Sequence, residues 1–216
     1  MKESIIKGVL VVLLIISYQG IAQQFEGKIV YNNSYVSKSK NVSNEQLTSL
    51  MGGTQVYYFK NGNYKSVFNG KFMQLLLYVN AENKLYNKFS TSNDYYWSDG
   101  NVEGEEVLNY ELHKKKETIL GYLCDELIIY TQKGTYTYYF NTDFKINAAQ
   151  FLNHNYANWS FYTEKAKALP LKIIMDVSEF KSSSIAVDIE RKKIENDIFI
   201  LPKGVKILPI TKLENK

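Results

Sequence analysis

Apolar and polar residues alternate along much of the chain after residue 24. In the segment 25–32, Phe25, Ile29 and Tyr31 fall on one side of an extended chain, and mainly charged or amide side chains fall on the other. A repeat of two residues is typical of a strand with one buried face. Comparable segments recur between Gly, Asn or Asp residues, at 55–60, 64–68, 72–79, 84–89, 95–98, 118–120, 125–131, 135–140, 169–177 and 184–192. Their spacing predicts an antiparallel meander.

Local signals predict turns and helices between these strands. The Asn61-Gly62 pair separates two strand segments and is a strong hairpin signal. Ser43 begins a capping box, which predicts a short helix over 43–50. A second helical stretch is expected at 148–152, and the aromatic segment Tyr156–Tyr162 then interrupts the strand pattern.

Several predicted strands are apolar on both faces, namely 56–59, 75–79, 127–130 and 173–175. An antiparallel sheet with one face in water should alternate instead, as Ile185, Val187 and Ile189 do in the last strand segment. These strands must therefore be covered on both faces, by helices and sheet curvature, by a second sheet, or by a ligand. Small barrels can enclose one such ligand.

We therefore expect a mainly β protein, a curved antiparallel sheet or half-open β-barrel with one or two short helices packed on it. Residues 23–210 are expected to form a single domain and residues 211–216 a C-terminal tail. The 18 Tyr and 11 Phe against three Pro agree with this, because aromatic residues favour strands.

The first 22 residues have the three regions of a cleavable secretory signal. Lys2 and Lys7 give a basic start, Gly8–Ile16 is apolar, and small residues precede a cut after Ala22. The apolar run is too short for a spanning helix, which needs roughly 20 residues. We expect a periplasmic or secreted protein without a lipid anchor, because Gln23 and not Cys would come first.

Composition and motifs argue against most kinds of catalytic or nucleic-acid chemistry. The net charge is only +4, and Arg191 is the single arginine, so no nucleic-acid partner is expected. His113 and His154 lie far apart in the sequence, outside any zinc motif. Cys124 is alone, so no internal disulfide forms, and we expect a buried thiol. We predict no enzyme activity, no catalytic residue, no cofactor and no metal ligand.

Two charged segments leave alternatives open. Asp99–Glu106 has oxygen side chains at the first, third and fifth positions of a calcium loop, but the twelfth position is Tyr110. An acidic hairpin tip is the preferred interpretation, with calcium binding left open. Lys114–Lys116 is expected to be a solvated loop or strand end, with contact to an acidic surface as the alternative.

Four segments occur in an order that resembles a known family. They are Phe25–Tyr31, Ile119–Cys124, Leu169–Lys172 and Phe199–Gly204. Together they resemble exported bacterial domains of unknown function near the GLPGLI type, although the GLPGLI string itself is absent. Such domains are similar to the LolA/LolB-like periplasmic lipoprotein carriers. The resemblance implies a half-open antiparallel barrel whose helices plug a hydrophobic cavity.

The first functional hypothesis is an exported, non-enzymatic protein of the bacterial envelope that binds a lipid, an acyl chain or another apolar small molecule. The residues expected to contact this ligand are Tyr58, Leu76, Tyr78, Ile129, Trp159, Phe161 and Tyr162. The segment Tyr156–Tyr162 would act as lid or rim. The alternative is an envelope interaction or structural module with a filled core, whose partner is another envelope protein. The chain is expected to be a monomer.

Overall fold

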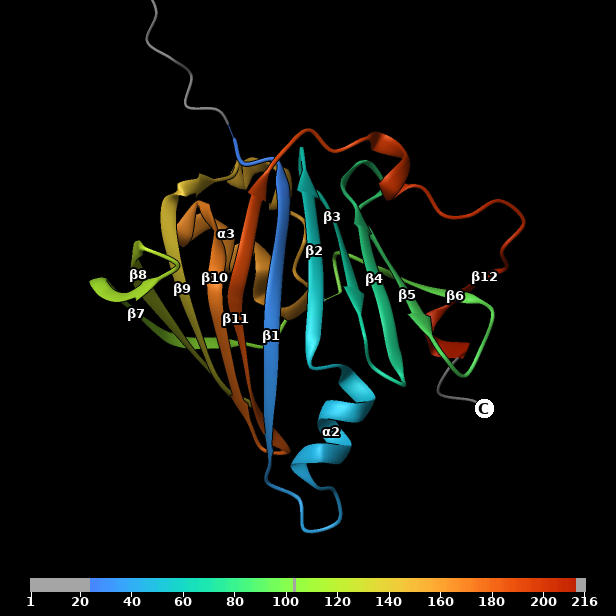
Figure 1. The fold of residues 1–216 in the computed structure, drawn as a ribbon, viewed down its shortest axis with the longest axis horizontal. Coiled ribbons are helices and arrows are strands. Elements are labelled where there is room, and N and C mark those ends of the chain that lie inside the picture. Colours follow the sequence, from blue (N-terminus) through green and yellow to red (C-terminus); the bar gives the residue numbers. More distant parts are fainter. Residues whose placement is uncertain (1–23, 103, 213–216) are drawn as a thin grey trace, which may run out of the picture.

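The computed structural model describes residues 24–102 and 104–212, and the predicted signal peptide lies outside them. The described chain forms one curved, unclosed sheet of 12 strands (Figure 1). The strands are β1 Gly27–Ser37, β2 Thr54–Lys60, β3 Asn63–Phe68, β4 Met73–Val79, β5 Lys84–Phe89, β6 Tyr95–Asp99, β7 Val107–Ile119, β8 Tyr122–Thr131, β9 Gly134–Lys145, β10 Ala168–Val177, β11 Phe180–Arg191 and β12 Ile207–Pro209.

Short helices complete the fold. The α-helices are α2 Asn44–Met51 and α3 Trp159–Ala166, and the 3-10 helices are η1 Asn80–Glu82, η2 Ala148–Phe151, η3 Tyr156–Asn158, η4 Asn196–Phe199 and η5 Ile210–Lys212. The mainly β, curved antiparallel architecture predicted from the sequence is confirmed, with β12 beside β6 as a parallel pair.

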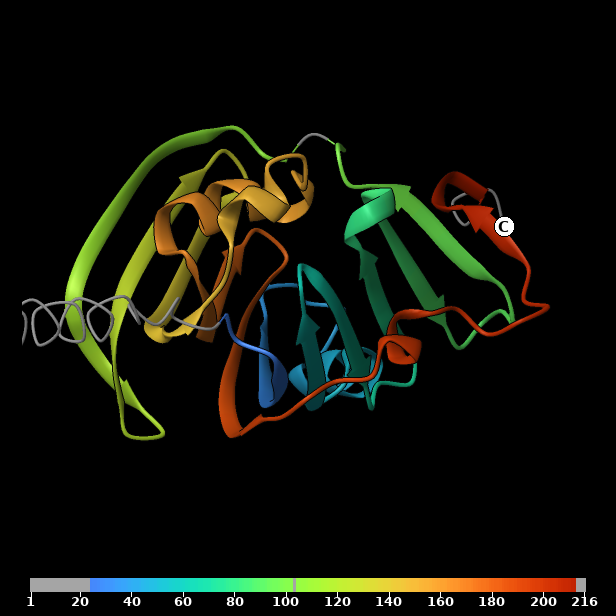
Figure 2. The same cartoon turned by 90° about the horizontal axis from the view of Figure 1, so that it is seen from above.

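The sheet consists of two meanders joined by the first strand. Its order is β12-β6-β5-β4-β3-β2-β1-β11-β10-β9-β8-β7, so β2–β6 form one half and β7–β11 the other. Strand β1 pairs with β2 on one side and with β11 on the other. The two halves thus meet at β1 and curve toward each other, as Figure 2 shows from above.

The segment Asp99–Glu106 is not the tip of a hairpin, which corrects the sequence interpretation. It leads from β6, near one edge of the sheet, to β7 at the opposite edge (Figure 2). Strand β6 pairs with β5 and β12, whereas β7 pairs with β8. Turn-forming residues mark where a strand ends, but they do not say whether the next strand pairs with it. Across the described residues, no group of three or more His, Cys, Asp or Glu could hold a metal ion.

Two further strand predictions need correction. Strand β7 begins at Val107, well before the predicted segment 118–120, and Lys114–Lys116 fall in an irregularity within it, where the register with β8 shifts. In β11, the expected alternation breaks at Val187. The register with β1 shifts there, because Val30 faces Asp188 and Tyr31 faces Ala186. This bulge leaves Val187 exposed and turns Ala186 into the core.

Local predictions for the turns and helices are confirmed. Helix α2 begins with the Ser43 capping box, and the β2–β3 hairpin turns at Asn61-Gly62. The stretch predicted to be helical at 148–152 is the 3-10 helix η2. These features depend on residues close in sequence, which is why the sequence alone predicts them.

The strands that are apolar on both faces are covered by different parts of the chain. Helix α3 and the 3-10 helices η2 and η3 lie in the concave space of the arch (Figure 2). On the convex side, Leu77 packs with Ile194 and Phe199 of the C-terminal segment. The Glu26 carboxylate accepts a hydrogen bond from the Ile194 backbone N–H at 2.6 Å and so fastens this segment beside β1.

A tight contact between the β3–β4 turn and the end of α2 provides a test of the packing. A Cβ atom at Gly70 would lie 2.4 Å from the Leu50 carbonyl oxygen and 2.8 Å from the Gly52 amide nitrogen. Both are backbone atoms that cannot rotate away. We predict that Gly70→Ala lowers the free energy of unfolding by about 1–3 kcal/mol, in the range for overpacking.

The matched control is Gly53→Ala, whose Cβ would meet its nearest neighbour at an ordinary 3.5 Å. Urea unfolding of both variants measures the difference. Equal stabilities for the two variants would contradict the close approach at Gly70.

Candidate functional site

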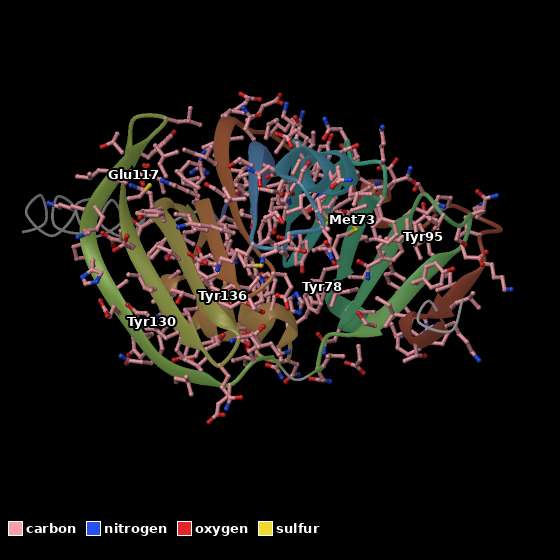
Figure 3. All side chains as sticks on the ribbon, turned by 90° about the horizontal axis from the view of Figure 1, so that it is seen from below. Met73, Tyr78, Tyr95, Glu117, Tyr130 and Tyr136 are labelled. Carbon is pink, nitrogen blue, oxygen red and sulfur yellow. The ribbon has the colours of Figure 1, made fainter. Side chains whose placement is uncertain are left out.

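A pocket of about 180 Å³ lies on the concave side of the sheet, where the two meanders and the segment before α3 meet. The walls come from strands of both halves and the cap from η3 and α3. The lining residues are Tyr31, Gln55, Tyr57, Tyr64, Ser66, Leu76, Tyr138, Tyr156, Ala157, Trp159, Pro170, Ile173 and Met175. Figure 3 shows the side chains that fill the concave space, with Tyr78 and Tyr136 directed into it from opposite halves.

Strand register explains why these residues share one face. Tyr57 of β2 is the cross-strand partner of Ser66 in β3, and Ser66 is the partner of Leu76 in β4. Cross-strand partners point to the same side of a sheet. On the other half, Ile173 of β10 is the partner of Tyr138 in β9. The pocket therefore lies between two rows of side chains, one from each meander.

One wall is a continuous stack of aromatic rings. Tyr57 stacks on Tyr64 with ring centroids 5.5 Å apart, and Tyr64 stacks on Tyr78 at 5.2 Å. His154 lies parallel to Tyr78 at 4.0 Å, and its Nε2 is 2.8 Å from the Tyr64 hydroxyl oxygen. Such contacts and this buried hydrogen bond fix the rings in place, so the wall is preformed.

The cap of the pocket has unusual backbone geometry. Ala157 and Asn158 are in the left-handed region, with φ of 51° and 57°. Asparagine tolerates this conformation better than other non-glycine residues, whereas for Ala157 it costs roughly 1–2 kcal/mol. The segment between β6 and β7 stabilises this backbone conformation, because the Asn158 side-chain amide donates to the Glu105 carbonyl oxygen at 3.0 Å. The Asn155 backbone N–H also donates to the Gly100 carbonyl oxygen at 2.7 Å.

The pocket is electrically neutral. Its lining contains no charged side chain among the described residues. Burial raises the pKa of the Tyr57 and Tyr64 hydroxyls well above 10, so both stay protonated. Burial also lowers the pKa of the His154 imidazole from 6.5 to about 4. A neutral, largely apolar surface favours an uncharged ligand, because an ion would lose its hydration without gaining a partner.

The volume limits what the pocket can hold. A cavity of about 150 Å³ lined by aliphatic and aromatic side chains can take up benzene, whereas pockets for drug-sized ligands measure roughly 300–1,000 Å³. At about 180 Å³, this pocket fits one substituted ring or the end of an apolar chain.

The structure places the ligand residues expected from the sequence in several different environments. Leu76 and Trp159 line the pocket. Tyr78 lies behind Tyr64 in the aromatic stack. Tyr58 packs in the convex-side cluster instead, because its neighbour Tyr57 takes the concave face and adjacent strand residues point in opposite directions.

The other expected residues lie under or on helix α3. Ile129 is fully buried in the core cluster beneath it. The Tyr162 hydroxyl donates to the Ala168 carbonyl at 2.9 Å, which fixes this ring within the core. Phe161 contacts Tyr110 of β7, with ring centroids 5.5 Å apart.

Sequence reasoning missed most of the lining, although one signal was present. A two-residue hairpin loop fixes the register of its strands, so Asn61-Gly62 places Tyr57 opposite Ser66. The wall from β9 and β10 has no such local signal.

Two further features concern Cys124 and the helices. The Cys124 thiol is fully buried, and burial raises its pKa to about 11, so it is a poor nucleophile. In the part of the chain that the structure describes, no helix is long and apolar enough to cross a membrane.

Burial of His154 predicts a specific pH dependence of stability. Its pKa is about 4 in the folded protein and 6.5 when exposed, so between these values the unfolded chain binds a proton that the folded chain does not. This term lowers the free energy of unfolding as the pH falls below 6.5, by about 1.4 kcal/mol for each pH unit.

Urea unfolding between pH 7 and pH 4 checks this slope, with His154→Gln as the comparison. The variant removes the titrating group but keeps a polar side chain near Tyr64. It should show a smaller loss of stability on acidification. Parallel curves for the two proteins would contradict the assignment.

Comparison with known proteins supports the fold. In sequence, the chain matches no protein-family model and no curated protein. In structure, it is similar to PNGF-II in two crystal forms, each with a TM-score of 0.52, at 12% and 9% identity. Each match covers 88% of this chain but only 32% of PNGF-II, so the chain spans about a third of that protein's length.

A second, more distant structural neighbour is LprF from Mycobacterium bovis. Its TM-score is 0.34 at 10% identity, over 79% of this chain and 88% of LprF. At that score the likeness carries no argument about ligand or location. The comparisons therefore show the fold of this chain and nothing more specific.

Proposed function

We propose that this protein is a non-enzymatic binding protein of the bacterial envelope that holds an apolar molecule, or the apolar end of a lipid, in the concave pocket. The observation that carries the proposal is the pocket itself, a preformed and neutral cavity lined mainly by aromatic and aliphatic side chains. Such cavities are the usual sites for small apolar ligands.

The chemistry of the lining supports binding rather than catalysis. Acid–base and nucleophilic catalysis need a group that exchanges a proton near neutral pH or attacks a substrate. The buried tyrosines stay protonated and His154 stays neutral, while Cys124 belongs to a core cluster and not to the lining. These side chains can position an apolar molecule, but they supply no reactive group.

The size of the pocket sharpens the earlier hypothesis of a lipid carrier. About 180 Å³ accommodates one end of an acyl chain and not a whole lipid. A lipid would therefore insert its terminus between the two meanders and leave the remainder outside. The resemblance of the sequence to GLPGLI-type and LolA/LolB-like domains is a further reason to propose apolar ligands.

An envelope interaction module is the second candidate, and the free edge strand favours it. Strand β7 is an edge of the sheet and pairs only with β8. Leu108, Tyr110 and Leu112 alternate along it and are 59%, 44% and 42% exposed. An exposed apolar edge can bind an extended segment of a partner protein. Envelope cross-linking that traps one protein at β7, together with an empty pocket, would favour this candidate.

The ligand proposal predicts that changes at Leu76 weaken binding. The probe is cumene, whose affinity is measured by NMR titration. Leu76→Glu introduces a charge and Leu76→Phe fills space, so each should weaken saturable cumene binding at least tenfold, about 1.4 kcal/mol. Val67→Glu is the control, because Val67 lies on the adjacent strand β3, is 38% exposed and does not line the pocket.

Unfolding midpoints establish that each variant is folded before binding is compared. Retained affinity in both folded Leu76 variants would place the binding elsewhere. The absence of saturable binding to the unaltered protein would reject this pocket as a site for small apolar molecules.

The envelope location predicts cleavage after Ala22. Produced with its own first 22 residues in a Gram-negative bacterium, the chain should appear in the periplasmic fraction with the intact mass of a protein that begins at Gln23. Leu13→Arg interrupts the apolar run and should keep the precursor uncleaved in the cell. Ser4→Arg adds a charge to the basic start and should leave export unchanged. An unaltered chain that keeps its full mass would contradict cleavage.

A further inference from the structure

Two lining side chains of the pocket have buried polar atoms without a hydrogen-bond partner. The Tyr57 hydroxyl and the Trp159 indole N–H are both buried, and neither is bonded within the described residues. Folded proteins leave few such groups, because an unpaired buried donor or acceptor typically costs about 1–3 kcal/mol. Of the seven such atoms among the described residues, these two belong to the lining of one pocket, where a bound molecule can supply a partner.

The polar groups of Tyr31, Tyr64, Gln55 and Ser66 in the lining have partners within the protein. The Tyr31 hydroxyl donates to the Pro170 carbonyl at 2.7 Å. The Tyr64 hydroxyl oxygen lies 2.8 Å from His154 Nε2. The Gln55 side-chain amide donates to the Ser66 hydroxyl at 2.8 Å. Tyr57 and Trp159 differ from these neighbours in having no such partner.

The chemistry of the two groups specifies the missing partner. An indole N–H can only donate a hydrogen bond, and a tyrosine that stays protonated can donate one as well. Both are therefore satisfied by an acceptor oxygen. Since no charged side chain lines the pocket, a carboxylate or phosphate oxygen would be buried without a counter-charge. The acceptor must belong to an uncharged molecule.

The shape of the site specifies the rest of the molecule. The Tyr57 and Tyr64 rings stack with an interplanar angle of 27°, and the Trp159 ring lies 6.1 Å from that of Tyr64. Flat aromatic walls favour a flat ring, which can stack on them or meet them edge to face. Aliphatic contacts come from Leu76, Ile173 and Met175.

We propose that the pocket selects an uncharged aromatic carbonyl compound, whose ring packs against the aromatic wall and whose oxygen accepts a hydrogen bond from Tyr57 or Trp159. The inference rests on the proposed function and names the chemical class of its ligand. It distinguishes this pocket from a purely hydrophobic one, which would take an alkylbenzene equally well.

Three probes with the same number of non-hydrogen atoms test the proposal: cumene, acetophenone and benzoate. The unaltered protein should bind acetophenone about tenfold more tightly than cumene, as expected for one added hydrogen bond in a buried site. Benzoate should bind more weakly than acetophenone, because it carries a charge. NMR titration gives all three affinities under one condition.

Tyr57→Phe and Trp159→Phe identify the donor. Tyr57→Phe keeps the ring and removes the hydroxyl, whereas Trp159→Phe removes the N–H with some loss of ring area. At least one variant should reduce the preference for acetophenone over cumene threefold or more, while cumene still binds. Tyr58→Phe is the control, since Tyr58 packs in the convex-side cluster and does not line the pocket, and it should keep the preference.

The outcomes separate this inference from the proposed function. Binding of cumene and acetophenone with equal affinity, tighter binding of benzoate, or an unchanged preference in both donor variants would overturn the carbonyl assignment and leave apolar binding in place. If none of the three probes binds, the proposed function fails and the assignment fails with it.

Discussion

The pairing of β1 with β11 and β2 is the interaction on which the rest of the structure depends. Residues Gly27–Ser37 pair along their length with β11, and the first part of the strand also pairs with β2. Within the sheet, the two meanders meet only at β1, which is hydrogen-bonded to one strand of each. Tyr31 adds a cross-link from this strand, because its hydroxyl bonds to the Pro170 carbonyl of β10. The pocket exists because both halves are held at this seam.

Because the sheet is curved, different segments of the chain cover its two faces. The concave face receives α3, η2 and η3, and the convex face of β4 and β5 receives the segment that contains Ile194 and Phe199. This explains strands with apolar residues on both faces. The pocket is the part of the concave face where the helical cover leaves space. In its cap, Ala157 keeps a strained backbone, and strain of this kind often accompanies a functional site.

The pocket combines rigidity with neutrality. The aromatic stack from Tyr57 to His154 fixes one wall, and burial keeps its titratable groups uncharged. Such a surface suits a neutral molecule of matching shape, which is the basis of the proposed function. The similarity to PNGF-II concerns the arrangement of strands alone, so the ligand has to be argued from the pocket residues.

The sequence by itself determined most of the strands, the Ser43 helix start, the Asn61-Gly62 hairpin and the need for cover on both sheet faces, because these depend on residues close in the chain. It also pointed to Leu76 and Trp159. It missed β12 and most of β7. Only the tertiary structure decided that Asp99–Glu106 crosses the arch, that the bulge exposes Val187, and that Tyr58 faces the convex side. Those features depend on which distant strands pair, since pairing sets the register and face of every side chain.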